Sequence, residues 1–408
     1  MNSHTKDNTT SVIVVGAGPA GATAAYFLAQ AGVDVLLVDQ ATFPRDKSCG
    51  DSICPGATAT LTRMGLAEWA RNYAVNREYF LSSPNGTMAR IPFPTHLAEH
   101  PNYLIPRREF DHALVQRAVE VGARLHEGTR ITGMERVDAQ QVRLHGKSGR
   151  RTDNVTAFTA QLVIAADGSI SSFTRRLGMG GTVDAVALRR YYAGVTGQPG
   201  TLELHWEKSM LPAYGFIFHL NDGIANVGTG MFQSDLRRLK TNLNKLLDTF
   251  VTHNPHARAA LADASPLGPI AGHPYRDDAE HITPYADNVL LVGDAAGTGH
   301  PMTGEGIGPA MASAELAANV AMHALHTGDV SAAGLAEYGR SVHAKFDRVH
   351  RVSRLARTAL TLPWMVDRTI KRCSHDQDFA AQLAGILAGV VSPAAMLKPG
   401  TALRALLG

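Results

Sequence analysis

Two of the three cysteines in this 408-residue chain, Cys49 and Cys54, lie in the stretch SCGDSICPGA and are separated by four residues. Thiols at this spacing could bind a metal, form a disulfide or act as a redox pair. No further cysteine or histidine pair at zinc-ligand spacing follows in the sequence, so we predict no metal site. An odd number of cysteines in a long chain also argues against a disulfide framework. We therefore expect reduced thiols that lie beside the chemistry of another group.

The N-terminal part of the chain has the pattern of a strand, a glycine-rich turn, a helix and a second strand. Residues 11–15 (SVIVV) form a β-branched run, and GAGPAG follows at residues 16–21. Residues 22–31 have the composition of a helix, and residues 33–38 (VDVLLV) form a second apolar run that ends before Asp39. This order predicts a βαβ unit whose turn binds a dinucleotide.

The residues of this motif have separate roles in such a turn. Gly16 permits the tight turn, Gly18 lets the backbone approach a pyrophosphate, and Gly21 permits close packing of the helix on the strand. Ala20 lies in the first helical turn, whose free N–H groups would face the phosphates. Asp39 lies where a carboxylate can accept hydrogen bonds from ribose hydroxyls. We expect all five residues to contact the cofactor.

Two later apolar runs also stop at residues that suit a cofactor site. The run LVIAA is followed by Asp167 and Gly168, and the run NVLLV is followed by Gly293 and Asp294. A glycine-rich turn after the second run leads into a long apolar helix. Both pairs are therefore predicted at the ends of strands, where ligands of an open α/β sheet bind.

In this order, the three motifs resemble those of the FAD-binding superfamily that contains p-hydroxybenzoate hydroxylase. The resemblance implies that Asp294, with Gly293 beside it, bonds the ribityl chain of a flavin. It also implies that Asp167 and Gly168 lie near the cofactor and its reductant. We therefore predict FAD as the cofactor.

The turn that holds Gly304, Gly306 and Ile307 suits the ring of a reduced flavin. The free N–H groups and the positive dipole end of the following helix would stabilise negative charge near N1 and O2 of the ring. The chain has no second GxGxxG motif between a strand and a helix. The reductant would therefore be transiently bound NAD(P)H or another electron carrier.

Two segments narrow the resemblance to one family. FPRDKSCG and PMTGEGIGP resemble the FPRxKxCG and PxxGEGI motifs of the geranylgeranyl reductase family, which includes menaquinone reductases and prenyl-chain reductases. The resemblance implies that Arg45 and Cys49 lie close to the flavin and its substrate channel. The segment PRREFDHAL also fits the family and places Arg107 near the cofactor, with a surface helix charge as the alternative. We predict a positioning or proton-relay role for Cys49, with simple packing as its alternative, and a packing role for Cys54.

Two further polar residues lie in the turn that would face the flavin. His300, immediately before Pro301, is a catalytic candidate, and a structural role is its alternative. Glu305 fits better as a residue that holds the turn than as a general acid.

The intervening sequence predicts a second module. Residues 79–103 and 183–274 alternate polar and apolar residues in short runs, which is typical of an antiparallel sheet. The resemblance implies that this sheet covers the flavin ring and supplies the substrate pocket. The segment PAYGFIFHLNDGIANVG resembles the family's PGYGWIFPLxDGxxNVG, with Phe216 in place of tryptophan and His219 in place of proline.

Four residues of this segment are predicted to bind the substrate. They are Tyr214, Phe216, Phe218 and His219. His219 would add a titratable group to the pocket and is a catalytic candidate. The alternative is that the two phenylalanines belong to the core of the sheet and that His219 points to solvent.

These patterns predict an α/β fold: a Rossmann-like FAD-binding domain with an inserted antiparallel-sheet substrate domain and a helical C-terminal region. The FAD-binding domain would be discontinuous in sequence. The remaining segments would form the sheet domain and the C-terminal region. The predicted segments are 10–78, 104–182 and 275–340 for the first domain, 79–103 and 183–274 for the second, and 341–408 for the third.

Charge and hydropathy limit the partners. The net charge of +3 is too small to favour nucleic-acid binding, so we expect a small apolar organic substrate and an electron-donor protein as partners. Residues 340–372 hold nine basic and two acidic residues, and apolar residues recur every three positions from Phe346 to Leu355. This pattern predicts a helix packed on the body or lying on an anionic membrane surface.

The sequence shows no secretory signal and no apolar run of 18 residues, so we expect a cytoplasmic protein with peripheral membrane association as an option.

Three functions remain open at this point. The first is an FAD-dependent reductase of a carbon–carbon double bond in an isoprenoid- or polyketide-like substrate. The second is a monooxygenase of the same fold, a hydroxylase or epoxidase that uses NAD(P)H and O₂ in secondary metabolism. The third is a flavin-binding protein without redox turnover. The GEGI turn favours the reductase.

Overall fold

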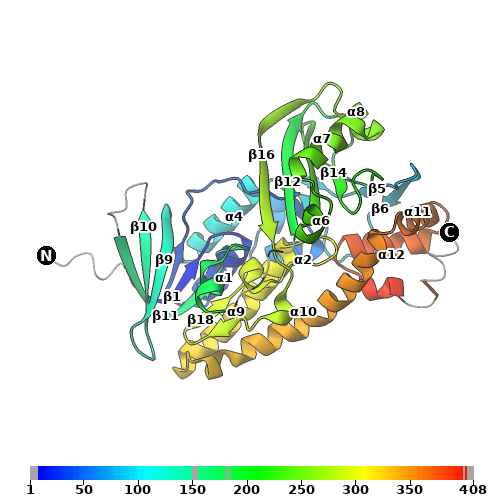
Figure 1. The fold of residues 1–408 in the computed structure, drawn as a ribbon. Coiled ribbons are helices and arrows are strands. Elements are labelled where there is room, and N and C mark those ends of the chain that lie inside the picture. The colour runs from blue at the N-terminus through cyan, green and yellow to red at the C-terminus, as the bar shows by residue number, and fades with distance from the viewer. Residues whose placement is uncertain are drawn as a thin grey trace.

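Two large sheets and a set of long helices form the body of the protein (Figure 1). The computed structural model describes residues 8–148, 155–397 without 180, 182 and 184, and 400–401. In Figure 1 the sheet that begins the chain lies at the left, the second sheet forms the upper lobe, and the C-terminal helices run below both.

An eight-stranded sheet carries the glycine motif. Its strands are β1 (Thr9–Val15), β2 (Val35–Val38), β8 (Arg124–His126), β9 (Thr129–Arg136), β10 (Val142–Ser148), β11 (Val155–Ala165), β17 (Tyr285–Ala286) and β18 (Val289–Leu291). The order β18-β11-β1-β2-β8 is parallel throughout, and β9, β10 and β17 add antiparallel pairs. All residues of β2 and β18 are buried, as is typical of parallel strands covered on both faces.

Three helices pack together beside this sheet. They are α1 (Pro19–Gln30), α4 (Arg107–Glu120) and α9 (Ile307–Thr327), of which α1 and α9 are rich in alanine, and α1 contacts both of the others. Ala22, Ala25, Ala314 and Ala318 are fully buried in the same core cluster. Because alanine side chains are short, α1 and α9 can pack closely.

A seven-stranded sheet forms the upper lobe. Its strands are β5 (Glu78–Ser82), β6 (Met88–Pro92), β12 (Ala185–Ala193), β13 (Thr201–His205), β14 (Tyr214–His219), β15 (Ile224–Phe232) and β16 (Ser265–Tyr275). The order is β16-β12-β15-β14-β13-β5-β6, and every pair is antiparallel except β13 with β5. The helices α6 (Gln233–Arg238), α7 (Leu243–His253) and α8 (Pro255–Ala260) follow β15 in the chain. The α7 helix packs on β12 and β15, with Phe250 fully buried against Gly215.

Short elements connect the two sheets. They are β3 (Ser52–Ile53), β4 (Ala74–Val75) and β7 (Tyr103–Leu104), which form a third sheet, and α2 (Pro55–Arg63), α3 (Ala67–Ala70), α5 (Ser172–Arg176), η1 (Ala279–His281), η2 (Gly293–Ala296) and η3 (Pro393–Leu397). The chain therefore crosses between the large sheets several times, and residues from distant segments meet between them.

The C-terminal helices are α10 (Ala332–Leu360), α11 (Pro363–Cys373) and α12 (Gln377–Leu387). The basic segment 340–372 is thus two helices, because Pro363 begins α11 and disfavours helical backbone at the residue before it. Arg354 of α10 forms ion pairs with Asp277 and Glu280 at 3.1 and 2.7 Å, so part of the basic face is used inside the fold. Among the described helices, none is both long and apolar enough to cross a membrane.

The predicted fold class is confirmed: a parallel sheet of the Rossmann-like FAD-binding type, an additional large sheet and a helical C-terminal region are all present. The predicted antiparallel sheet contains one parallel pair, β13 with β5, because β5 comes from an earlier segment of the chain. The division of the chain into domains at the stated boundaries stays a prediction.

Tyr338 fixes the long helix α10 to the parallel sheet. Its fully buried hydroxyl donates to the carbonyl oxygen of Leu291, at the end of β18, at 2.6 Å. We expect Tyr338→Phe to lower the free energy of unfolding by about 1–2 kcal/mol, because the carbonyl is left unpaired in the core. Tyr73→Phe removes a solvent-accessible hydroxyl bonded to Glu109 and is the matched control, with an expected loss below about 0.5 kcal/mol. Equal losses in urea denaturation of the two variants would contradict this account.

Candidate active site

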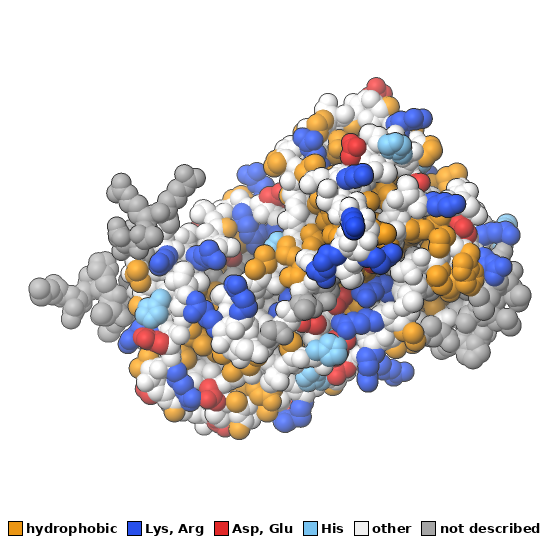
Figure 2. Space-filling view, in the orientation of Figure 1, with side chains coloured by type: hydrophobic (Ala, Val, Ile, Leu, Met, Phe, Trp, Pro, Cys, Tyr) orange, Lys and Arg blue, Asp and Glu red, His pale blue; other side chains and the backbone are white. Residues whose placement is uncertain are grey.

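A cavity of about 480 Å³ lies between the two large sheets. One side is formed by the glycine turn before α1, the residues after β11 and β18, and the turn before α9. The other side is formed by β12, β13, β14 and β15 of the upper lobe. Figure 2 shows basic side chains next to hydrophobic ones where the upper lobe meets the C-terminal helices. The cavity thus joins a polar, glycine-rich wall to an apolar wall.

The glycine turn before α1 has a backbone that side chains would disrupt. Gly16 has a φ of +97°, and a Cβ on Gly21 would lie 1.7 Å from the carbonyl oxygen of Gly16. A Cβ on Gly18 would have Arg45 Nη2 at 3.8 Å as its nearest atom, so the space on this side of the turn is open. Gly18 and Ala20 line the cavity, and the N-terminus of α1 has no side-chain cap. The free N–H groups of this helix are available to an anion.

Asp39 holds the turn from the end of β2. Its carboxylate accepts hydrogen bonds from the N–H groups of Ala17 and Ala41 at 2.6 and 2.7 Å. The side chain is buried, and the predicted contact of Asp39 with a ribose stays a prediction.

The second half of the polar wall comes from the residues after β11 and β18. Gly168, Gly293, Asp294, Gly304, Gly306 and Ile307 all line the cavity. The helix α9 begins after Gly306 without a side-chain cap. The uncapped N-termini of α1 and α9 therefore open into one cavity, where both helix dipoles favour negative charge.

One carboxylate of this region faces the cavity. Asp294 lies on the cavity wall, and burial raises its pKa against the opposing charges of Lys47 and Arg107. The hydroxyls of a ribityl or ribose chain could donate to it. Asp167 is not among the lining residues: its Oδ2 accepts from Ser172 and its Oδ1 is buried, so its contact with the cofactor stays a prediction. The glycine cradle, the uncapped helices and Asp294 fit FAD.

A buried ion-pair network fixes the cationic residues. Asp111 of α4 accepts two hydrogen bonds from Arg107 at 2.7 Å each and one from Arg45 at 2.6 Å. Burial opposes the charge on Arg107, but Asp111 outweighs burial and raises the pKa of Arg107 above its usual value. Arg107 lines the cavity, and Arg45 lies beside Gly18. The structure thus brings both predicted arginines to the glycine turn.

Cys49 lies on the wall of this cavity, and its predicted role beside a flavin stays a prediction. Burial raises the pKa of its thiol, and the opposing effect of Arg107 is smaller. All three cysteines are free thiols. Cys49 is therefore a neutral thiol at physiological pH, which is able to donate a proton or a hydrogen bond.

Next to Cys49, the buried carboxylate of Asp51 joins the two sheets. It accepts from the hydroxyl of Tyr191 at 2.6 Å and from Nδ2 of Asn226 at 2.7 Å, both from the upper lobe. The N–H of Arg107 donates to its other oxygen at 3.2 Å. Burial raises the pKa of Asp51 to about 6 despite these bonds.

Glu305 and Cys54 both lie on the cavity wall. Burial raises the pKa of Glu305 to about 7, against hydrogen bonds from the Gly308 N–H and the Cys54 thiol. Burial also raises the pKa of Cys54 well above its usual value, and Glu305 adds to this effect. Cys54, predicted to pack, therefore also faces the cavity. Sequence reasoning assigned Glu305 only to the turn, although the acid inside the apolar GEGI motif was a visible signal.

The apolar wall contains three of the four residues predicted to bind the substrate. Tyr214, Phe216 and Phe218 line the cavity from alternate positions of β14. Sequence reasoning missed Leu202, Leu204, Trp206 and Met231, which line it from the same sheet or directly after it. Alternation along β13 and β15 was the signal that could have identified them.

His219, the fourth residue predicted to bind the substrate, does not lie on the apolar wall of the cavity. It is on the opposite face of β14 from Phe216 and Phe218, is not among the residues that line the cavity, and bonds Glu203 at 2.8 Å. The physical reason is the period of two along a strand, which turns residue 219 away from residues 216 and 218. The geometry gives no support to a substrate-binding or catalytic role for His219, and its alternative, exposure to solvent, is also wrong because the side chain is buried.

His300 is used to hold the turn before α9. Its Nδ1 accepts from the N–H groups of Met302 and Thr303 at 3.3 and 3.2 Å, and its Nε2 lies 3.2 Å from Ser353 Oγ. Burial, with His350 nearby, lowers the pKa of His300 to about 4. The ring is therefore neutral and already bonded at both nitrogens. This geometry favours the structural alternative over the predicted catalytic role.

Comparisons with known proteins agree with this site. The model of the FAD binding domain family matches residues 9–353. A menaquinone reductase of Mycolicibacterium smegmatis is 31% identical over 380 residues, which cover 86% of this chain and 85% of that protein. A digeranylgeranylglycerophospholipid reductase of Methanothermobacter thermautotrophicus is 30% identical over 402 residues, which cover 95% and 97%.

Solved structures share the fold. A geranylgeranyl bacteriochlorophyll reductase-like protein of Thermoplasma acidophilum matches with a TM-score of 0.79 and 22% identity, over 96% of this chain and 99% of that chain. A flavin-dependent halogenase matches with a TM-score of 0.70 and 23% identity, over 91% and 67%. The predicted resemblance and the predicted cofactor are both confirmed. The chain belongs to the FAD-binding domain family and is an FAD-dependent oxidoreductase of the geranylgeranyl reductase type.

Proposed function

We propose that the protein reduces carbon–carbon double bonds in a polyprenyl chain. The observation that carries this proposal is the single cavity in which the flavin-type polar wall continues into a wall of leucine, methionine and aromatic side chains. Such a wall suits a hydrocarbon chain and offers few partners to a polar substrate. Two relatives are named for quinone and prenyl-lipid reduction, which supports the same substrate class.

In this reaction one hydride and one proton add across the double bond. Bound reduced FAD supplies the hydride. The turn at Gly304 and Gly306 and the N-terminus of α9 would hold the negative charge of the cofactor, and Asp294 would hold its ribityl chain. Phe216 and Phe218 would exclude water and orient the double bond.

We assign the proton to Glu305. Its pKa of about 7 keeps a substantial fraction of the acid protonated at neutral pH, and its side chain lies on the cavity wall. Cys54 lies on the same part of the wall and would return a proton to this carboxyl group. Cys49, on the same wall nearer Arg107, would position the substrate or relay protons.

The proposal also covers the source of the electrons and the source of the substrate. Because the chain carries one dinucleotide motif, NAD(P)H or a protein electron carrier would reduce the flavin in a transient complex. A prenyl-lipid substrate would be taken from a membrane at the α10–α11 turn, where Leu362 and Trp364 are exposed beside basic residues.

Substitution of the proposed acid tests its role. We expect Glu305→Gln to lower kcat by about 100-fold or more, because the amide is not a proton donor of comparable strength. The wild-type rate is expected to fall as the pH rises through about 7, since only the protonated acid donates, and the variant is expected to lose this dependence. Glu315→Gln, on the far side of α9 in an ion pair with Arg63, is the control and should keep both rate and pH profile. An unchanged pH profile in Glu305→Gln, with normal flavin content, would assign the proton to another group.

Isotope labels distinguish the reductase from a monooxygenase. Menaquinone and a digeranylgeranyl phospholipid are supplied with dithionite or NAD(P)H, in D₂O, with and without ¹⁸O₂. We expect product to form without oxygen, to gain deuterium at the saturated carbons and to hold no ¹⁸O. Strict dependence on O₂ with ¹⁸O in the product would establish the monooxygenase instead. Flavin that no donor reduces would indicate a protein without redox turnover.

Vesicle flotation tests the proposed membrane contact. We expect the protein to float with anionic vesicles and Trp364→Ser to weaken this binding by about threefold or more, since an exposed aromatic side chain is lost from the interface. Val137→Ser, equally exposed at 44% against 46% but after β9, is the control and should float normally. Flotation that is absent, or is lowered equally by both substitutions, would contradict the contact.

A further inference from the structure

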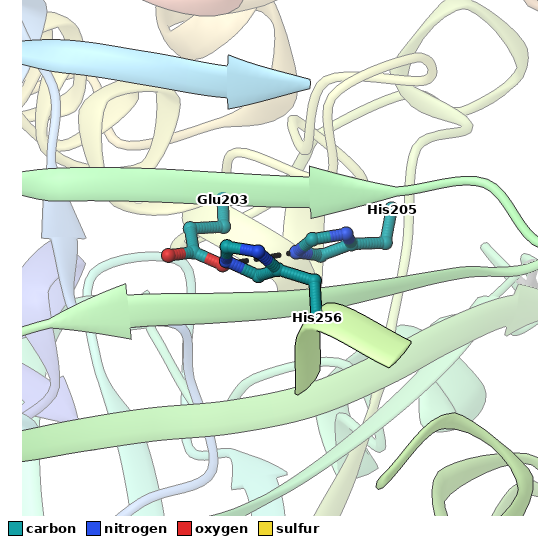
Figure 3. Close-up of side chains that lie close together, drawn as sticks. All are labelled: Glu203, His205 and His256. Atoms are coloured by element: carbon teal, nitrogen blue, oxygen red, sulfur yellow. Dashed lines mark hydrogen bonds and ion pairs between the residues drawn. The ribbon is translucent and has the colours of Figure 1, made fainter. Parts of the chain in front are cut away.

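Three histidines surround one buried carboxylate on the outer face of the upper sheet. Figure 3 shows two of them, His205 and His256, with Glu203. Glu203 Oε2 lies 3.0 Å from Nε2 of His205 and 2.9 Å from Nε2 of His256. Glu203 Oε1 lies 2.8 Å from Nε2 of His219. The four residues come from β13, β14 and α8, so the fold itself assembles the cluster.

The arrangement has the features of a built ligand set. The ligand atoms of Glu203, His205 and His256 all lie within 4.8 Å of one another. Nδ1 of His205 lies 2.8 Å from Ser82 Oγ, an outer contact that orients the ring and directs Nε2 toward the carboxylate. Glu203, His205 and His219 are buried, and the side chain of His256 is 35% exposed, which leaves a path from solvent.

The spacing is close to that of a tetrahedral site. Zinc bonds of about 2.0–2.1 Å to imidazole nitrogen and carboxylate oxygen put neighbouring ligand atoms about 3.3 Å apart. The two N···O distances at Glu203 Oε2, 3.0 and 2.9 Å, therefore need to open by only about 0.3–0.4 Å to admit the ion. Imidazole and carboxylate donors together favour Zn²⁺ over the hard cations Mg²⁺ and Ca²⁺.

We propose that Glu203, His205 and His256 bind one zinc ion that has a structural role, with a water molecule as the fourth ligand and with His219 on the other carboxylate oxygen. Binding needs the neutral tautomer in which Nε2 is free, so the proton of each ligating imidazole lies on Nδ1, and in His205 this proton donates to Ser82 Oγ. The ion would join α8 to β13, whose other face lines the cavity. It would lie outside the cavity, so it takes no part in the proposed reduction.

The position on β13 supports a structural role. Leu202 and Leu204 line the cavity, whereas Glu203 and His205 alternate with them and lie on the other face. Phe80 stacks on His256 with ring centroids 4.6 Å apart, which holds the exposed ligand in place. A cross-link here would fix the strand that presents the two leucines to the substrate.

Zinc titration of the full-length protein, without a histidine tag and after chelation, tests the site. We expect calorimetry to give one Zn²⁺ per chain, and Co²⁺ to give the visible absorption of a four-coordinate ion. His256→Gln should raise the Kd by about tenfold or more, since one ligand is lost at a surface position that the fold tolerates.

His253→Gln is the matched control. It changes an exposed histidine at the end of α7, three residues away, and should leave zinc binding unchanged. Glu203→Gln should abolish binding, and circular dichroism and flavin content report whether that variant folds. Absence of stoichiometric binding, or binding that His256→Gln does not weaken, would overturn the proposal and leave a hydrogen-bonded cluster without metal. Because the readout is metal affinity, its failure leaves the proposed reductase activity untouched.

Discussion

The architecture depends on one buried carboxylate that holds the two large sheets together. Asp51 sits in a loop of the first sheet and bonds Tyr191 of β12 and Asn226 of β15. Asn226 also donates to the carbonyl oxygen of Cys49 at 2.7 Å, so the loop is held at two points. A buried acid with these partners fixes distance as well as orientation, since loss of either partner would leave a charge or a polar group unsatisfied. Together with the Arg189–Asp46 ion pair, this contact holds the two walls of the cavity in place.

Local sequence was enough to predict the polar wall. The roles of Gly16, Gly18 and Gly21 depend on backbone contacts within a few residues, and such contacts follow from the order strand, turn, helix. The ends of β11 and β18 were equally visible, because an apolar run that stops at an acid marks the carboxyl edge of a parallel sheet. Local patterns therefore predicted the fold class and the residues that form the polar wall of the cavity.

The apolar wall was predicted less well because it depends on which face of a strand points inward. Phe216 and Phe218 were placed correctly on the cavity, and His219 was grouped with them although alternation puts it on the opposite face. The cluster around Glu203 was not predicted at all. Its members lie up to 53 positions apart, from 203 to 256, so no short sequence motif identifies them as one set of ligands. Only the register of β13 with β14 and the position of α8 bring them together.

Burial acts on the titratable groups of the cavity in a direction that depends on their charge type. It raises the pKa of the acids and thiols, which favours neutral donors, and it lowers the pKa of Lys47 and His273. The pKa of Arg107 is raised instead, because its ion pair with Asp111 outweighs the effect of burial. Fixed positive charge therefore persists beside the glycine turn, whereas the region around Glu305 and Cys54 holds groups that keep a proton more readily than in water. An anionic dinucleotide at one end and an apolar chain that needs a proton at the other are the ligands that match this division.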